Sequence, residues 1–283
     1  MSHSTISWRV PLSKQRLASG ARQLSFPHWQ WGTLGLVAAC GIFLALLLLP
    51  LVTLFVRALP GLLAGVWQHP AIVSALHLSL WTSTCAMLIS VLLGTPVAYV
   101  LARYRFPGAA LLDTLVDLPV VLPPAVAGMA LLATFGRNGV VGQYLAPWGI
   151  ELPFTVLAVV MAQTFVAVSL YIRAGKSAFA KIDVRVEQAA ATLGHSPWHT
   201  FHRVTLPLAR NALLGGALMA WARALGEFGA TMIFAGNFSG RTQTMPLAIY
   251  TAMQADVNVA LTLGAILLGV SFGVLAVLRF LGR

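Results

Sequence analysis

Residues 76–102 read LHLSLWTSTCAMLISVLLGTPVAYVLA, a run of 27 residues without a single Asp, Glu, Lys or Arg. A helix needs about 20 mainly apolar residues to cross the roughly 30 Å hydrocarbon core of a bilayer. The whole chain of 283 residues carries only 9% charged residues, whereas a soluble domain carries about 25%. So few charges cannot cover a globule of this size, and the sequence predicts an all-α membrane protein.

Six apolar stretches predict six transmembrane helices. Their bounds are about 34–56, 76–102, 118–136, 152–172, 211–236 and 257–278. The stretch 211–236 is the one that contains charged residues, Arg223 and Glu227. The first helix follows a polar arm, residues 1–33, and the other five belong to a core over residues 70–283. Residues 1–33 show no strong apolar periodicity, which indicates a flexible or surface-lying cytoplasmic arm.

The basic residues predict the orientation of these helices. With the N-terminus in the cytoplasm, fourteen Lys and Arg residues fall inside and only Arg57, Arg137 and Arg241 fall outside. Cytoplasmic loops carry such an excess of positive charge. We therefore expect both termini in the cytoplasm. The net charge of +11 is a signal of topology, and we expect no nucleic-acid partner.

Residues 175–207 form the one long loop between predicted helices, and its sequence favours a helical hairpin. Asp183 is a suitable N-cap and Gly194 a suitable stop for a first short helix. Ser196 and Pro197 begin a second one, and Pro207 is expected to break the chain before the next span. Helices this short are marginal in water, so the hairpin needs a surface to dock on. That surface is either a partner protein or the ends of this protein's own helices.

Several motifs resemble a known family. Glu187-Gln-Ala-Ala-x-x-x-Gly194, followed by Val204-x-Leu206-Pro207, resembles the EAA loop of ATP-binding-cassette (ABC) importer permeases. The family's usual glutamate is Gln188 here, and Glu187 lies one residue earlier, which leaves open which of the two does the usual work. The segments 118–124, 222–231, 234–237 and 241–250 are similar to permeases for molybdate and, less closely, for sulfate and tungstate.

The resemblance implies a type I ABC importer permease fold in a bacterial cytoplasmic (inner) membrane. It also implies a second copy of the chain as a homodimer partner, two cytosolic ATPase subunits and an extracytoplasmic oxyanion-binding protein. The permease would then be no enzyme and need no cofactor, because its partners hydrolyse ATP. The loop would be a coupling hairpin that contacts the ATPase through Glu187, Gln188, Ala189, Ala190, Gly194, Trp198, Leu206 and Pro207.

Two features point to the translocation path. Arg223 and Glu227 are four residues apart, so they can face each other on one helix. They form a neutralised structural pair, contact the substrate directly or, as the resemblance implies, shape the path. Prolines in span 118–136 remove backbone donors and bend the helix, as in the discontinuous helices of transporters, although a bent packing helix explains them equally well. The resemblance implies a path or gate of Pro123, Pro124, Arg223, Glu227 and Gly229.

The segment 236–244 is expected outside the membrane. Gly236 to Thr242 superficially resembles a phosphate loop, but the glycine spacing is short by one residue and Arg241 replaces the required Lys. Asn237, Arg241, Thr242 and Thr244 form either a surface for the binding protein or a plain solvated loop. His195, His199 and His202 lack a carboxylate or Cys to complete a metal site, and we interpret them as surface histidines.

Two other classes of membrane protein compete with the ABC permease. A secondary transporter would be expected to show inverted repeats with matching broken spans in its two halves, and we find none in the sequence. A channel or a purely structural protein leaves the hairpin unexplained.

Overall fold

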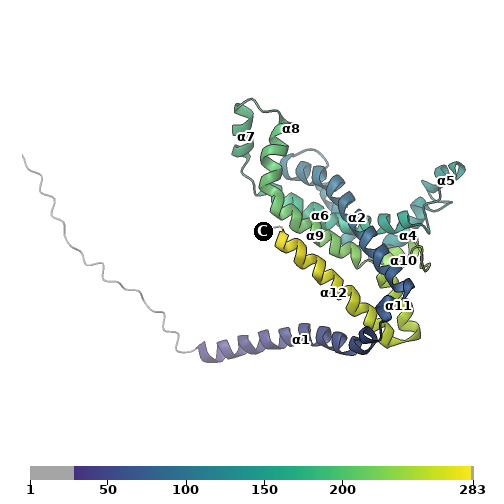
Figure 1. The fold of residues 1–283 in the computed structure, drawn as a ribbon. Coiled ribbons are helices and arrows are strands. Elements are labelled where there is room, and N and C mark those ends of the chain that lie inside the picture. The colour runs from purple at the N-terminus through teal and green to yellow at the C-terminus, as the bar shows by residue number, and fades with distance from the viewer. Residues whose placement is uncertain (1–28, 282–283) are drawn as a thin grey trace, which may run out of the picture. The chain divides into compact units, whose positions relative to one another are not determined.

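The computed structural model describes the backbone of residues 29–281 and the side chains of residues 35–276. The chain divides into two compact units, Met1–Leu51 and Val52–Arg283. Of the arm expected over residues 1–33, residues 1–28 lie outside the described residues. No strand occurs between residues 29 and 281, where all the regular elements are helices (Figure 1).

The helices follow one another with short connections. The long ones are α1 (Trp29–Leu63), α2 (Pro70–Arg103), α6 (Val156–Ala180), α9 (Leu206–Leu225) and α12 (Val257–Leu281). Between them lie α3 (Ala109–Val121), α4 (Pro124–Phe135), α5 (Gly142–Leu145), α7 (Val184–Thr192), α8 (Pro197–Thr200), α10 (Gly229–Phe234) and α11 (Met245–Ala255). Short 3₁₀ segments cover Val66–Gln68 and Ala146–Trp148, and a π-helical segment, η3, covers Phe201–Thr205.

Close packing of α2, α6 and α9 forms the largest part of the core. The buried face of α2 consists of small residues at helical spacing, namely Ala75, Ser79, Thr82, Ser83, Ala86, Ser90, Gly94 and Ala98. Gly175 of α6 leaves so little room that a Cβ there would lie 2.9 Å from the Cβ of Ala98. Small residues let the backbones of membrane helices approach each other in this way. The core therefore depends on shape more than on large side chains.

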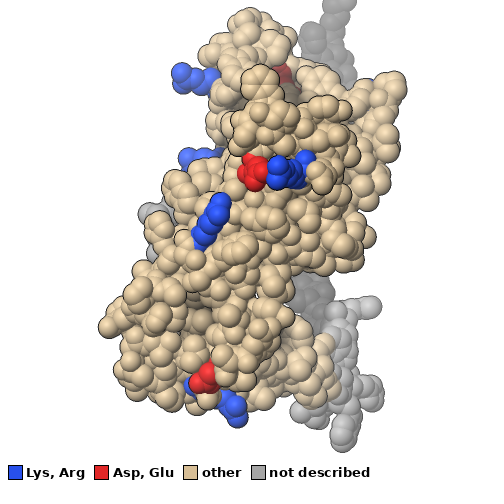
Figure 2. Space-filling view, turned by 90° about the vertical axis from the view of Figure 1, so that its right-hand side faces the viewer, with Lys and Arg blue, Asp and Glu red and all other residues tan. Residues whose placement is uncertain are grey.

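Four helices among the described residues are long and apolar enough to cross a membrane, and one bent pair is a fifth candidate. These four, α1, α2, α6 and α12, match four of the six expected spans, although α1 and α6 run beyond the expected ends. Figure 2 shows one face of the molecule on which an uncharged band separates charged side chains toward either end. Such a band suits contact with lipid. The number six and the orientation stay predictions.

The expected single span 118–136 is wrong in its boundaries. The chain forms two helices there, α3 and α4, which are bent by 114° at a break. At the break, Leu122 and Pro123 have extended backbone, with ψ of 131° and 134°. A proline disfavours helical backbone in the residue before it, so Pro123 and Pro124 divide the helix.

The expected span 211–236 is also not one helix. α9 ends at Leu225, and α10 begins only at Gly229. α9 is absent from the spanning candidates among the described residues, because Arg210, Asn211 and Arg223 lower its mean hydropathy. The prediction that Pro207 breaks the chain is wrong as well. Pro207 lies in the first turn of α9, where a proline is tolerated, so α8, η3 and α9 run on continuously.

Candidate functional site

The segment 183–207 folds into the hairpin that its local signals predict, and it lies at one end of α2, α6 and α9 (Figure 1). The Asp183 carboxylate accepts a hydrogen bond from the Arg185 backbone N–H at 2.9 Å and so caps α7. The Ser196 hydroxyl accepts one from the His199 backbone N–H at 3.3 Å and caps α8. Between the two helices Gly194 adopts a φ of +83°, which a residue with a side chain rarely adopts.

Glu187 and Gln188 have different surroundings in α7. Glu187 Oε1 lies 2.9 Å from Arg103 Nη2 at the end of α2, and it accepts a hydrogen bond from the Thr205 hydroxyl at 2.8 Å. The Glu187 side chain is only 15% exposed, whereas Gln188 is an exposed residue. Neighbouring residues on a helix do not face the same way. Glu187 is therefore held inside the chain, and Gln188 is open to a partner.

The hairpin carries an exposed apolar surface. Val184 is 48% exposed, Leu193 77% and Trp198 73%. Of the other residues that resemble the coupling motif, Ala189, Gly194 and Pro207 are exposed, Leu206 is half-buried and Ala190 is buried. Several exposed apolar side chains on one short hairpin favour a contact surface.

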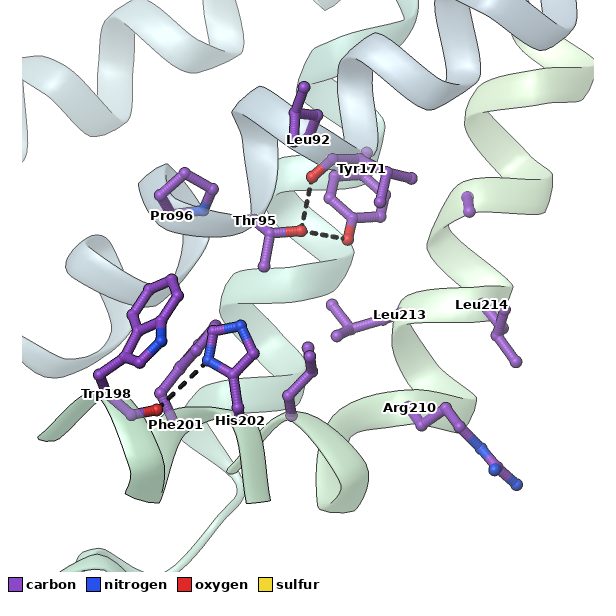
Figure 3. Close-up of a pocket in the computed structure, with 13 residues that line it drawn as sticks. Leu92, Thr95, Pro96, Tyr171, Trp198, Phe201, His202, Arg210, Leu213 and Leu214 are labelled. Carbon is purple, nitrogen blue, oxygen red and sulfur yellow. Dashed lines mark hydrogen bonds between the residues drawn. The ribbon is translucent and has the colours of Figure 1, made fainter. Parts of the chain in front are cut away.

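A groove of about 540 Å³, mostly apolar, lies between the hairpin and the long helices α2, α6 and α9 (Figure 3). Trp198 and His202 line it from the hairpin, and their ring centroids are 4.0 Å apart. Inside the groove the hydroxyls of Thr95 and Tyr171 are hydrogen-bonded at 2.7 Å. No pattern in the sequence indicates this groove, because its lining comes from three separate parts of the chain, namely residues 91–96, Tyr171 and residues 198–217.

The two helix breaks meet in space. A Cβ at Gly229, the first residue of α10, would lie 2.7 Å from the Cβ of Pro124, the first residue of α4. A Cβ at Gly128 would lie 2.9 Å from the backbone oxygen of Ala230. Both contacts are closer than side chains normally allow. Pro124 and Gly229, which the sequence placed in one path or gate, are thus in contact, while Gly128 gave no such signal.

Arg223 and Glu227 form an ion pair at the second break. The distance from Arg223 Nη1 to Glu227 Oε2 is 2.7 Å, and the Glu227 side chain is 1% exposed. Glu227 Oε1 also accepts a hydrogen bond from the Ala230 backbone N–H at 2.9 Å, which satisfies the start of α10. Both oxygens of Glu227 are engaged inside the chain. The Arg223 side chain remains 34% exposed.

The segment 236–244 at the opposite end of the long helices divides into buried and exposed residues. Thr242 and Thr244 are fully buried, and the Thr242 hydroxyl bonds to the Gly236 oxygen at 3.3 Å. Asn237 is half-buried and donates to the Thr251 hydroxyl at 2.9 Å, whereas Arg241 is exposed. The buried threonines shape the loop, so only Asn237 and Arg241 remain in the surface expected to face a partner.

Comparison with known families identifies the class of protein. Residues 90–282 match the family described as "Binding-protein-dependent transport system inner membrane component". The match covers the hairpin, both helix breaks and the segment 236–244. The chain belongs to this family, and it is a multi-pass ABC permease of the inner membrane.

Relatives of the chain include permeases named for molybdenum transport and for sulfate transport. The molybdenum transport system permease protein ModB of Haemophilus influenzae is 44% identical over 64% of this chain and 80% of its own length. ModB of Mycobacterium tuberculosis is 41% identical over 87% of this chain and 90% of its own. The sulfate transport system permease protein CysT of Synechocystis is 32% identical over 93% of this chain and 94% of its own.

Solved structures share the fold at low identity. A bacterial ABC transporter involved in the import of alginate matches with a TM-score of 0.70 and 15% identity, over 89% of this chain and 95% of that one. The MetNI methionine ABC transporter in an inward-facing conformation matches with a TM-score of 0.54 and 18% identity, over 74% and 93% of the two chains. These likenesses confirm the ABC importer permease fold.

Proposed function

We propose that this chain is the membrane-spanning permease subunit of a binding-protein-dependent ABC importer for a tetrahedral oxyanion, with molybdate as the first candidate. The observation that carries the proposal is the hairpin 183–207. The Glu187 carboxylate is bound inside the chain, whereas Gln188 and the exposed apolar residues of the hairpin face outward. A permease that does not hydrolyse ATP itself needs such a surface to bind an ATPase subunit.

The hairpin docks on a cytosolic ATPase subunit, one for each copy of the permease in a homodimer. Its end of the molecule carries the basic residues Arg103, Arg105, Lys176, Lys181 and Arg203, which supports a cytoplasmic location. Closure of the two ATPase subunits on ATP draws the hairpins together. ATP hydrolysis then returns the permease to its starting state. The permease provides the translocation path, and the ATPase subunits bind the nucleotide.

The paired helix breaks form the gate in the path. Discontinuous membrane helices border transport sites in many transporters, and α3–α4 and α9–α10 are both broken where they meet. The Arg223–Glu227 pair is neutral as a whole, so a dianion passing it is not bound as tightly as by an unpaired arginine. The exposed part of the Arg223 guanidinium is the group that meets the anion.

The segment 236–244 faces the extracytoplasmic binding protein through Asn237 and Arg241. The binding protein supplies most of the discrimination between anions, because hydrogen bonds of fixed geometry select a tetrahedral oxyanion better than a neutral path does. The choice of anion therefore depends mainly on the binding protein and not on the permease.

The test is to reconstitute the permease with its ATPase and its binding protein in proteoliposomes. ATP hydrolysis and uptake are measured with the binding protein loaded with molybdate, tungstate or sulfate. We expect molybdate to stimulate both. Stimulation by sulfate alone would make the chain a sulfate permease, an alternative that the CysT likeness supports. If no ATPase co-purifies and deletion of 183–207 leaves transport intact, a secondary transporter is the better description.

A further inference from the structure

The helix α7 is attached to the long helices through one charged side chain. α7 carries two charged residues, Arg185 and Glu187, and of these two only Glu187 forms an ion pair with a residue in the part of the chain whose side chains are described, residues 35–276. Its other packing is with α8 and η3 inside the hairpin. The position of α7 relative to α2 therefore depends strongly on this carboxylate.

Arg103, the last residue of α2, bonds to Glu187 of α7 and to Ile182, two residues before α7 begins. Its Nη1 donates to the Ile182 oxygen at 3.0 Å, and its Nη2 donates to Glu187 Oε1 at 2.9 Å. The same carboxylate oxygen accepts from the hydroxyl of Thr205, which is fully buried in η3 directly before α9. One carboxylate thus joins the end of α2, the helix α7 and the start of α9.

Burial makes this pair different from the surface ion pairs of the chain. The side chains of Arg103 and Glu187 are 8% and 15% exposed, whereas those of Arg173 and Asp117 are 55% and 36% exposed. A buried pair adds little net stability, but removal of one partner leaves the other charge desolvated and unpaired. Such a pair fixes geometry.

We infer that Glu187 is a positioning residue, which acts through Arg103 and Thr205 and not by contact with the ATPase. The three side chains form a strut that makes the cytoplasmic end of α2 move with the hairpin and with α9. This role rests on the proposed function, and it leaves the outward contact with the ATPase to Gln188. A movement of the hairpin then moves α2 and α9 at the same time.

A double-mutant cycle separates the strut from a direct contact. Arg103→Ala, Glu187→Ala and the double variant are reconstituted with ATPase and binding protein, and ATP hydrolysed per oxyanion imported is measured. Because the two residues act as one unit, we expect each variant to raise this ratio about fivefold and the double variant to raise it no further. Binding of the ATPase to the permease should change less than about twofold, since the outward surface is intact. Arg173→Ala, which breaks the exposed pair, is the matched control and should leave the ratio unchanged.

Hydrogen exchange of residues 184–192 in the purified permease tests the strut without any transport. We expect Arg103→Ala and Glu187→Ala to speed this exchange about tenfold because α7 loses its attachment to α2, and Arg173→Ala to leave it unchanged. Unchanged exchange in both strut variants would overturn the inference, as would weaker ATPase binding in Glu187→Ala alone. Absence of oxyanion-stimulated ATPase activity in the wild-type complex would instead refute the proposed function.

Discussion

The hairpin 183–207 and the paired helix breaks are built by opposite means. The hairpin depends on hydrogen bonds and on one ion pair, with caps from Asp183 and Ser196 and many side chains exposed. The breaks meet through close contact, with glycine on one side and proline or backbone on the other, and the Arg223–Glu227 pair lies at the second break alone. Polar attachments keep their geometry when a whole element moves, whereas close packing leaves no room for change. The hairpin suits a lever, and the breaks suit a gate.

The largest effect is expected from Glu227, the buried carboxylate of the proposed gate. Glu227→Ala removes the ion pair with Arg223 and the acceptor for the Ala230 N–H. Loss of one partner from a buried pair costs about 3–5 kcal/mol, and the partial exposure of Arg223 reduces this. We expect transport to fall at least about tenfold while the complex still assembles. Uptake by proteoliposomes with the purified complex is the measurement, and a wild-type rate contradicts the prediction.

A pair of glycines tests the packing of the gate directly. Gly229→Ala places a methyl group 2.7 Å from the Pro124 Cβ, whereas at Gly226 the nearest atom, the Ala222 oxygen, is 3.6 Å away. Overpacking of this kind costs about 1–3 kcal/mol. We expect Gly229→Ala to lower the thermal stability and the transport rate of the complex, and Gly226→Ala to change neither. If the two variants had the same thermal stability and transport rate, the gate would not differ from the hairpin in its dependence on close packing.

A smaller effect is expected at the outward face of the hairpin. Gln188→Ala removes an exposed amide that contacts the ATPase in the proposed assembly. Removal of a neutral hydrogen bond at an interface costs about 0.5–1.5 kcal/mol, so the ATPase should bind several times more weakly. Titration of the detergent-solubilised permease with ATPase measures this, with Thr192→Ala, on the same helix, as the control. Unchanged affinity shows that Gln188 lies outside the interface.

The smallest effect is expected at the N-cap of α7. Asp183→Ala removes the bond to the Arg185 N–H, which is worth about 1 kcal/mol of helix stability. The loss is local, so hydrogen exchange of residues 184–192 should quicken while the Tm of the whole permease stays the same. A fall in Tm would mean that the hairpin is as tightly integrated as the gate.

The sequence predicted the hairpin better than the gate because the hairpin signals are local. Asp183, Gly194 and Ser196 act within three residues of their own positions, and the structure confirms both caps and the stop. The bounds of the bent span were wrong because Asp113 and Asp117 look like loop residues. In the structure they lie in α3, paired with Lys176 and Arg173 of α6.

Long-range pairing hid other functional residues as well. From the sequence, Arg103 contributed only to the prediction of membrane orientation, because its partner Glu187 lies 84 residues away. The end of α9 at Leu225 depends on Glu227 accepting from the start of α10, which a hydropathy pattern does not show. The family resemblance supplied Pro124 and Gly229 as members of one path, but only the structure shows that they touch.

The contacts between α4 and α10 have a consequence for how the gate moves. Gly229 against Pro124 and Gly128 against Ala230 bring the two helices into close contact at two points. Any change in the tilt of one helix must be followed by the other, and the adaptable backbone lies at 122–123 and 226–228. In the proposed gate, the two broken helices therefore move as one rigid unit, and a substitution that separates them would let each helix move independently.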